Sequence, residues 1–312
     1  MGGTKCLGVA LDADGGVTRT ARVPTPATSG ELVDALAGIV AELGPASSVG
    51  VGMPGLVTHR GGLVASAHLR AMAGLAVADA LEPRIGMRPW VANDATCATA
   101  AEWRLGAARG CDDVVMVTLG TGIGGGVVTS GRLVTGRNGF AGEFGHMTVD
   151  PDGPPCPCGR RGCWERFASG TGLARLARDA AWGGGLRDVV ASAGGDVQAV
   201  RGEHVQEAAR AGDPDALAVV DEFARWVALG MANLTNALDP AAFVLGGGLA
   251  AGADLYLEPV RAWFARLLYA TDLRPPPDIR VAALGERAGA VGAALLGEIR
   301  RSPGARGAPT PG

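Results

Sequence analysis

The chain has 312 residues, of which 51 are glycine and 47% are hydrophobic, so it is long enough to bury the cores of two ordinary domains. Its formal net charge is -3 and 19% of its residues are charged, which argues against a nucleic-acid-binding protein and a polybasic membrane anchor. It has no run of eighteen apolar residues and no secretory signal pattern. We therefore expect a cytoplasmic protein with no nucleic-acid or membrane partner.

Hydrophobic spacing alternates between strand and helix patterns along the chain, which is typical of an α/β fold. Residues 6–11 and 17–23 are expected to form a hairpin, and 31–43 a helix with Ser29 as a possible cap. The next expected elements are a strand at 49–53, a hairpin turning at 60–62, a strand at 90–92 and a helix at 94–105. We assign residues 1–112 to an amino-terminal α/β domain, on which a helix at about 287–300 packs back.

Residues 113–286 are expected to form a second α/β domain, which begins with an apolar strand at 114–119 and a glycine loop at 120–126. Its other expected elements are strands at 127–129 and 242–245, a turn at 130–131, and helices at 165–181, 203–211 and 214–238. Residues 301–312 are rich in Pro, Gly and Arg, a composition that predicts a disordered tail.

Each half of the chain carries a Gly-Thr sequence that leads into an expected hairpin, Gly2-Gly3-Thr4-Lys5 and Gly120-Thr121-Gly122-Ile123-Gly124-Gly125. Glycine lets backbone N–H groups turn toward phosphate oxygens, and the threonine hydroxyl adds a donor. Neither sequence is a Walker loop, because GxxxxGK[ST] is absent. The repetition suggests a duplicated α/β domain around a cleft, although chance echoes are the alternative in a chain with so many glycines.

Three cysteines, Cys156, Cys158 and Cys163, are crowded together downstream of His146. Thiolate sulfur and imidazole nitrogen are preferred Zn2+ ligands, and three Cys with one His close a tetrahedral structural site. The segment is rich in Pro and Gly and has little core of its own, so a metal ion would hold its shape. Three reduced thiols in a loop are the alternative, but such a cluster is prone to oxidation. We therefore expect zinc.

Glu143 lies three positions before His146 among glycines, and Glu165 lies two positions after Cys163. One nitrogen of His146 can bind zinc while the other meets a ligand hydroxyl. Two carboxylates and an imidazole on one braced scaffold suit a polyol, because carboxylates accept hydrogen bonds from several hydroxyls at once. For Glu165 alone, a favourable charge at a helix start is the alternative, and both roles can hold.

Asn93 and Asp94 lie where a strand is expected to pass into a helix. Helix capping is a strong explanation for one of them. Binding sites in α/β sheets also lie at the carboxyl ends of strands. Together with the two Gly-Thr loops, that position favours a functional role for this pair.

Several motifs taken in chain order resemble those of the ROK family (repressor, open reading frame, kinase). They are GGTK at 2–5, NDA at 93–95, LGTGIGG at 119–125, GRNGFAGEFGHM at 136–147, CPCGRRGCWE at 156–165 and LGGG at 245–248. The order and spacing match from residue 2 to about 297, and within the family the chain most resembles bacterial ATP-dependent glucokinases. The resemblance implies an actin-like, hexokinase-type fold with two α/β domains around a cleft, a structural zinc ion, and transfer of phosphoryl from ATP, with Mg2+, to a hexose.

The same resemblance implies roles for individual residues. Asp94 would be the catalytic base that deprotonates a sugar hydroxyl, and Asn93, Asp94, Glu143, His146 and Glu165 would hold the sugar. The nucleotide would be bound by Gly2, Gly3, Thr4, Lys5, Gly120, Thr121, Gly122, Gly124, Gly125, Gly246, Gly247 and Gly248. Glucose would be converted to glucose 6-phosphate.

Two positions depart from the family pattern. Met1 precedes GGTK directly, whereas related kinases carry a strand that ends in Asp there, and that Asp helps to organise Mg2+. The first strand is therefore missing from this sequence, and we expect that its start was placed too late; as it stands, we expect weak or absent kinase activity. His68 stands where such glucokinases usually carry Asn, which leaves the choice of sugar less defined.

Other functions within the family stay open. The substrate could be N-acetylmannosamine, N-acetylglucosamine, fructose or allose, the donor could be polyphosphate, and the protein could be a non-catalytic sugar sensor. Regulators usually add an amino-terminal helix-turn-helix that this sequence lacks, and a sensor has no need of Asp94, so an enzyme is favoured. We also expect a homo-oligomer, a dimer or a tetramer.

Overall fold

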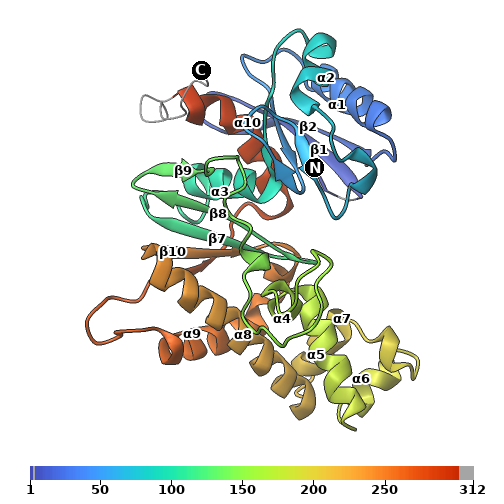
Figure 1. Cartoon of the computed structure of the whole chain (residues 1–312), viewed down its shortest axis with the longest axis vertical. Helices are drawn as coiled ribbons and strands as arrows, with labels where there is room; N and C mark the ends of the chain where they lie inside the picture. Colours follow the sequence, from blue (N-terminus) through green and yellow to red (C-terminus); the bar gives the residue numbers. More distant parts are fainter. Residues whose placement is uncertain (3, 302–312) are drawn as a thin grey trace. The chain divides into compact units, whose positions relative to one another are not determined.

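The computed structural model describes residues 1–2 and 4–301, and strands and helices alternate through this range, which confirms the α/β class (Figure 1). The tail expected at 301–312 lies outside the described residues except for Arg301, the last residue of helix α10 (Ala288–Arg301). Contacts divide the chain into two compact units. Of the described residues, unit 1 contains those in 1–116, 126–142 and 283–301, and unit 2 contains 117–125 and 143–282.

Two separate strand pairs form the framework of unit 1. The expected first hairpin is present, with β1 (Lys5–Leu11) antiparallel to β2 (Val17–Pro24). A parallel pair joins β3 (Gly50–Met53) to β6 (Trp90–Asn93). The other elements of this unit are α1 (Ser29–Leu43), β4 (Leu56–Val57), β5 (Leu63–Ala65), η1 (Arg70–Met72), α2 (Val77–Ile85), α3 (Asp94–Leu105), β9 (Arg132–Val134), η5 (Gly285–Arg287) and α10.

Helix α1 has a different cap from the one expected. The Thr28 hydroxyl accepts a hydrogen bond from the Glu31 amide, and the Glu31 carboxylate accepts one from the Thr28 amide. This reciprocal pair satisfies two amides at once, so Thr28 is the cap and Ser29 is the first helical residue. Gly44 ends the helix with a φ of 89° that favours glycine.

Helix α10 lies directly against α3. A Cβ atom at Gly292 would overlap the backbone carbonyl of Cys97, so only glycine permits this approach. The segment that leads into α10 is held by Glu102, whose buried carboxylate accepts hydrogen bonds from the amides of Ala107, Ala283 and Leu284 at 2.8–3.1 Å. These hydrogen bonds attach the segment before α10 to α3, although the two are far apart in the sequence.

A five-stranded sheet has the order β11-β10-β7-β8-β9. Its remaining strands are β7 (Val114–Leu119), β8 (Ile123–Thr129), β10 (Ala242–Gly246) and β11 (Asp278–Val281). The expectation that residues 120–126 form a glycine loop is therefore wrong beyond Gly122, because β8 already begins at Ile123. The glycines within β8 allow close packing: a Cβ at Gly126 would overlap the side chain of Thr99.

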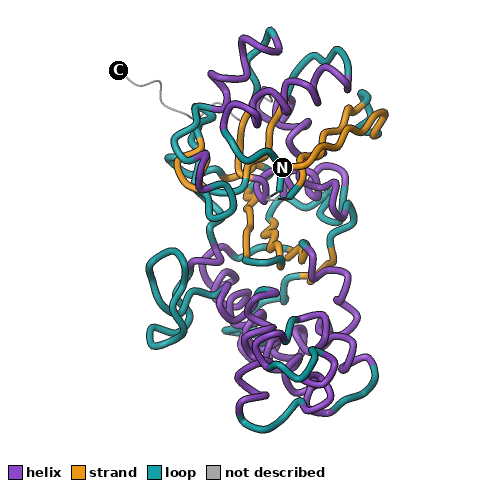
Figure 2. Tube along the Cα trace, turned by 90° about the vertical axis from the view of Figure 1, so that its right-hand side faces the viewer, coloured by secondary structure: helices purple, strands orange, loops and turns teal. Residues whose placement is uncertain are grey.

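Most of the regular secondary structure of unit 2 is helical (purple in Figure 2). They are α4 (Glu165–Ala168), α5 (Gly170–Trp182), α6 (Arg187–Ser192), α7 (Gly202–Arg210), α8 (Pro214–Leu238) and α9 (Ala253–Leu267), with short turns η2 (Phe144–His146), η3 (Val197–Ala199) and η4 (Gly248–Gly252). The bounds of α8 agree with the prediction. The single helix expected at 165–181 is two helices, because Ser169 is extended and caps α5 by accepting from the Gly172 amide. Among the described residues, none of the helices is long and apolar enough to cross a bilayer.

Trp164 anchors the Cys-rich segment to α8. Its side chain is fully buried, and its indole N–H donates to the backbone carbonyl of Trp226 at 2.7 Å. The ring lies on Gly230, where a Cβ atom would overlap it. Trp164 stands between Cys163 and Glu165, so its packing also positions these two site residues.

We predict that Gly230→Ala destabilises the protein. Alanine has the higher helix propensity by about 1 kcal/mol, but the added methyl group must displace a buried, hydrogen-bonded ring, and overpacking of this kind costs about 1–3 kcal/mol. Denaturant unfolding measures the difference. Gly38→Ala in α1 is the control, because a Cβ there meets nothing within 4 Å and should leave stability unchanged or improve it. A Gly230→Ala protein as stable as the wild type would contradict this packing.

Candidate active site and metal centre

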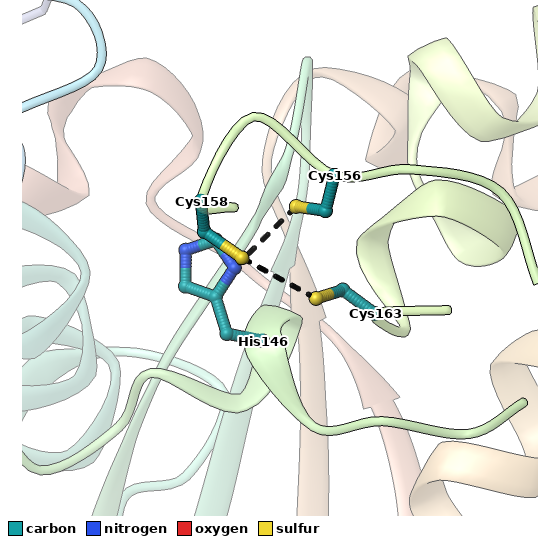
Figure 3. A group of neighbouring side chains, drawn as sticks. All are labelled: His146, Cys156, Cys158 and Cys163. Atoms are coloured by element: carbon teal, nitrogen blue, oxygen red, sulfur yellow. Dashed lines mark hydrogen bonds between the residues drawn. The ribbon is translucent and has the colours of Figure 1, made fainter. Parts of the chain in front are cut away.

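The side chains of His146, Cys156, Cys158 and Cys163 point toward one another in unit 2 (Figure 3). Their ligand atoms all lie within 4.8 Å of one another. The Cys158 and Cys163 sulfurs are 3.6 Å apart, and the Cys156 sulfur is 3.9 Å from Nδ1 of His146. A tetrahedral zinc ion with Zn–S bonds of about 2.3 Å needs sulfurs about 3.8 Å apart. The donor set and its spacing therefore fit such an ion.

Tight turns and a short bridge build this cluster. The Cys156 amide donates to the Arg160 carbonyl at 2.8 Å, the Gly159 amide donates back to the Cys156 carbonyl at 3.0 Å, and Thr148 bridges to Cys163. Burial raises the pKa of the Cys156 and Cys163 thiols. Against the effect of burial, the Arg160 amide and the neighbouring thiols lower the pKa of Cys158. A bound cation would favour the thiolate at all three positions.

The carboxylate of Glu165, the first residue of α4, touches both the cluster and the second Gly-Thr loop. One oxygen accepts from the Cys156 thiol at 3.2 Å and lies 3.8 Å from Nδ1 of His146. The other lies beside Gly122, where a Cβ atom would be only 2.6 Å from it. A side chain at Gly122 would displace this carboxylate, which contacts both the loop and the Cys/His cluster.

The two nitrogens of His146 face different partners. Nδ1 faces the sulfur atoms and Glu165, whereas Nε2 lies 4.0 Å from the carboxylate of Glu143. The side chains of His146 and Glu143 are 40% and 35% exposed, so both can still reach a ligand, while Glu165 is only 18% exposed. The structure thus brings together the three residues expected to contact a polyol in this unit.

The start of α5 holds the second Gly-Thr loop. The Gly170 amide donates to the Gly120 carbonyl at 2.7 Å, and the Thr171 hydroxyl donates to the Thr121 carbonyl at 2.8 Å. With these two carbonyls engaged by α5, the loop is fixed at successive residues. Thr171 was not among the residues expected at the site, because its only sequence signal is a Ser-Gly-Thr step inside an expected helix.

The glycines at 246–248 lie against the same loop. Gly247 has a φ of 85°, and a Cβ atom there would be 2.5 Å from the carbonyl oxygen of Leu119, the residue before Gly120. Gly124 and Gly125, which were expected in a loop, lie in β8, and the Gly124 amide donates to the Thr118 hydroxyl at 3.2 Å. Two of the segments expected at the nucleotide are therefore neighbours in unit 2.

Asn93 and Asp94 lie in unit 1 at the start of α3. Asn93 is the cap: its side-chain oxygen accepts from the amides of Ala95 and Thr96 at 2.8 and 3.0 Å, and its side-chain amide donates to the Gly55 carbonyl. The capping explanation therefore applies to Asn93. Burial raises the pKa of the Asp94 carboxyl, while the Met1 ammonium group and His68 act in the opposite direction.

The first Gly-Thr loop also lies in unit 1. The Gly2 amide donates to the Lys5 carbonyl at 2.9 Å, and Gly3 lies outside the described residues. The Lys5 ammonium group pairs with Glu286 of η5, which also pairs with Arg22 at 2.7 Å. Lys5, expected at the nucleotide, thus has a carboxylate partner in unit 1.

The sequence profile of the ROK family matches residues 1–299. A glucokinase of Streptomyces coelicolor is 40% identical over 301 residues, which cover 95% of each chain. An N-acetylmannosamine kinase of Shigella boydii is 34% identical over 305 residues, 96% of each chain. The solved structure of a ROK family glucokinase from Streptomyces griseus, in complex with glucose and AMPPNP, superposes with a TM-score of 0.83 at 40% identity and covers 95% of this chain and 96% of that one.

Proposed function

Since this chain belongs to the ROK family, we propose that it phosphorylates glucose with ATP to give glucose 6-phosphate. The observation that carries this proposal is the 40% identity of the chain, over nearly its full length, to a glucokinase whose structure holds glucose and AMPPNP, an analogue of ATP. A hexose kinase, a phosphotransferase with an alcohol acceptor, also suits the candidate site residues described in each unit. Cytoplasmic action and assembly into a homo-oligomer stay predictions.

In this proposal Asp94 is the catalytic base. Its carboxylate accepts the proton of a sugar hydroxyl as that oxygen attacks the γ-phosphorus of ATP. A pKa raised by burial makes the carboxylate a stronger base than an exposed one. Because Asn93 satisfies the first amides of α3 as its cap, the helix start is ordered around Asp94.

Glu143, His146 and Glu165 are the proposed sugar-binding residues of unit 2, together with Asn93 and Asp94 of unit 1. Carboxylates accept from neighbouring hydroxyls, and Nε2 of His146 faces away from the sulfur cluster toward Glu143. The side chains of Glu165 and His146 are held by contacts with Cys156 and with each other. These side chains therefore lose little conformational entropy when they bind a sugar.

The nucleotide is proposed to bind at the glycine segments. In unit 2, the Gly120 amide already donates to the Gly122 carbonyl, so the amides of Thr121 and Gly122 are the ones that would face the phosphates. Residues 246–248 would lie near adenosine. In unit 1, Gly2, Gly3, Thr4 and Lys5 are the expected counterpart. Mg2+ bound with ATP neutralises charge on the transferring phosphoryl group, and polyphosphate is an alternative donor.

We propose that His146, Cys156, Cys158 and Cys163 bind a structural zinc ion. The geometric fit of the donor atoms supports this, as does the scarcity of apolar residues in the loop that carries them. The ion would hold Nδ1 of His146 and the loop beside Glu165, and would thereby brace the proposed sugar contacts.

N-acetylmannosamine is the second candidate acceptor. The 34% identity to an N-acetylmannosamine kinase over nearly the full length favours it. His68, which departs from the glucokinase pattern, is close enough to Asp94 to influence its pKa. A coupled assay with glucose, N-acetylmannosamine, N-acetylglucosamine, fructose and allose would decide: a higher kcat/KM for any other sugar would displace glucose, and no turnover with any of them would favour a sugar sensor.

We predict that Asp94→Asn abolishes turnover and leaves glucose affinity nearly unchanged. Asn can still form hydrogen bonds but cannot take the proton, and general bases of this kind contribute about 10²–10⁴-fold to rate. Coupled kinetics and calorimetric titration with glucose measure the two effects. Asp34→Asn on the exposed face of α1 is the control. Full activity of the Asp94 variant would sink its role as the base.

Removal of the Thr171 hydroxyl should weaken nucleotide binding selectively. Thr171→Val deletes one hydrogen bond to the loop, and a neutral hydrogen bond contributes about 0.5–1.5 kcal/mol, so the KM for ATP should rise roughly two- to tenfold. Thr171→Ser keeps the hydroxyl and should behave as the wild type. Steady-state kinetics with each substrate varied in turn would test this; an equal rise in both KM values would argue against a role at the nucleotide.

Loss of a thiol should release the metal and loosen the sugar site. We expect about one zinc per chain in the wild type and much less in Cys158→Ser. We also expect a weaker affinity for glucose in this variant, because changes around a metal site commonly lower metal affinity or activity by about 10–100-fold. Elemental analysis and glucose titration provide the readouts. Cys111→Ser lies outside the cluster and serves as the matched control. Unchanged glucose affinity after loss of the metal would contradict the proposed bracing.

A further inference from the structure

The sulfur atoms of the Cys/His cluster differ in their access to solvent. Cys158 is exposed, whereas Cys156 and Cys163 are buried, with 7% and 0% of their surface exposed. The three cysteines outside the cluster are buried or half-buried. A reagent dissolved in water therefore reaches the sulfur of Cys158 more readily than those of the other five cysteines.

The sulfur of Cys163 lies next to that of Cys158, at 3.6 Å (Figure 3). An S–S bond is about 2.05 Å long, so the two atoms need to approach each other by roughly 1.5 Å to form one. Rotation between the rotamers of an exposed side chain supplies a movement of this size. The cluster thus places an accessible thiol beside a buried one, an arrangement in which oxidation gives a disulfide.

The backbone holds Cys163 in place and leaves Cys158 on an outer turn. Residues 147–149 form backbone hydrogen bonds of 2.8–2.9 Å with both neighbours of Cys163, one of which is the buried Trp164. Cys158 instead lies in the segment 157–161, in which every residue is exposed. Cys158 is therefore the member of the pair that can move toward its partner.

Cys156 is a poorer partner for Cys158. Its thiol already donates to the Glu165 carboxylate at 3.2 Å. A single residue, Pro157, separates the two cysteines, and its fixed φ lies within the small ring that a disulfide between them would close. Disulfide geometry is specific, and such a short ring meets it only with strain. The four residues between Cys158 and Cys163 make a larger ring.

We propose that Cys158 is a site of oxidation by hydrogen peroxide and that it forms a reversible disulfide with Cys163. The modification uses two residues of the proposed metal site. Formation of the bond depends neither on the metal ion nor on which reaction the chain catalyses.

The oxidation balances in two steps. The Cys158 sulfur attacks one oxygen of the peroxide: an S–O bond forms, the O–O bond breaks, and the second oxygen leaves as water with the thiol proton. The Cys163 sulfur then attacks the Cys158 sulfur: the S–S bond forms, the S–O bond breaks, and the oxygen leaves as a second water with the Cys163 proton. The two sulfurs lose two electrons in total, and the peroxide gains them.

The disulfide removes two of the four donors of the cluster and leaves Cys156 and His146. A structural zinc site has four ligands, so an ion held there would be released. The effect on the sugar rests on the proposed function: once His146 and the loop beside Glu165 are no longer braced, affinity for glucose should fall by about tenfold or more. Thiol reductants open the disulfide, so the change is reversible.

Digestion with trypsin separates the two sulfurs, which makes the bond detectable by mass. The full chain as isolated is treated with hydrogen peroxide, its remaining thiols are alkylated, and it is digested without reductant. Cleavage after Arg160 and Arg161 leaves Cys158 on residues 138–160 and Cys163 on residues 162–166. We expect these two peptides to be joined after oxidation and separated by dithiothreitol, with zinc released to a chromogenic chelator as the bond forms.

Two variants show which sulfur reacts. Cys158→Ser should leave the two peptides separate, although Cys156 is still present on the longer one. Cys111→Ser, outside the cluster, is the matched control and should form the bond as the wild type does. Calorimetric titration with glucose, before oxidation, after it, and after reduction with zinc supplied, should show the loss of affinity and its recovery.

Two outcomes would overturn the disulfide. The peptides could stay separate while Cys158 is oxidised to the sulfinic or sulfonic acid, or they could be joined in Cys158→Ser, which would make Cys156 the reactive residue. Zinc that is fully retained in the joined form would overturn the loss of the metal site. Because the bond is detected by mass without substrates, its failure is distinct from failure of the kinase assignment.

Discussion

The contacts of one carboxylate connect the Cys/His cluster of unit 2 to the Gly-Thr loop of the same unit. Glu165 accepts from the Cys156 thiol with one oxygen and presses the other against Gly122 of the Gly-Thr loop. Glu165 thus contacts both the residues expected to bind the sugar and the glycine loop expected to bind the phosphates. Trp164, buried beneath α8, fixes the chain at the neighbouring position, so the anchor has a rigid base.

Local chemistry that depends on residue type and spacing was predictable. Three cysteines and a histidine in a segment poor in apolar residues pointed to a metal site, and their ligand atoms do converge. The Pro214–Leu238 helix was predicted to the residue, because its apolar period is long and Pro214 at its start lacks an amide that would need a partner. The sequence could not say which residue of the Asn93-Asp94 pair caps the helix. The structure shows that Asn93 is the cap, because its side chain accepts hydrogen bonds from two amides.

Features that depend on tertiary contacts were not predictable. The start of β8 at Ile123 was missed because glycines carry no strand signal, and their value there lies in the space they leave for Thr99. The break between α4 and α5 at Ser169 has only a weak sequence signal. The Ser169 hydroxyl caps α5 by accepting from the Gly172 amide, and the break does not end the hydrophobic period of the sequence. Glu102, in the last turn of α3, has the sequence context of an ordinary helical residue, and only the folded chain brings Ala283 and Leu284 to it.

The contact between α10 and α3 bears on the order in which the chain can fold during synthesis. Gly292 rests on the backbone of Cys97, in the first third of the sequence, whereas residues 143–282 of unit 2 form an unbroken stretch. Domains emerge from the ribosome amino end first and generally fold as units. The helix that carries Asp94 must therefore wait, with one side uncovered, until almost the whole polypeptide has been translated, and this nascent stage is when the protein most needs protection from aggregation.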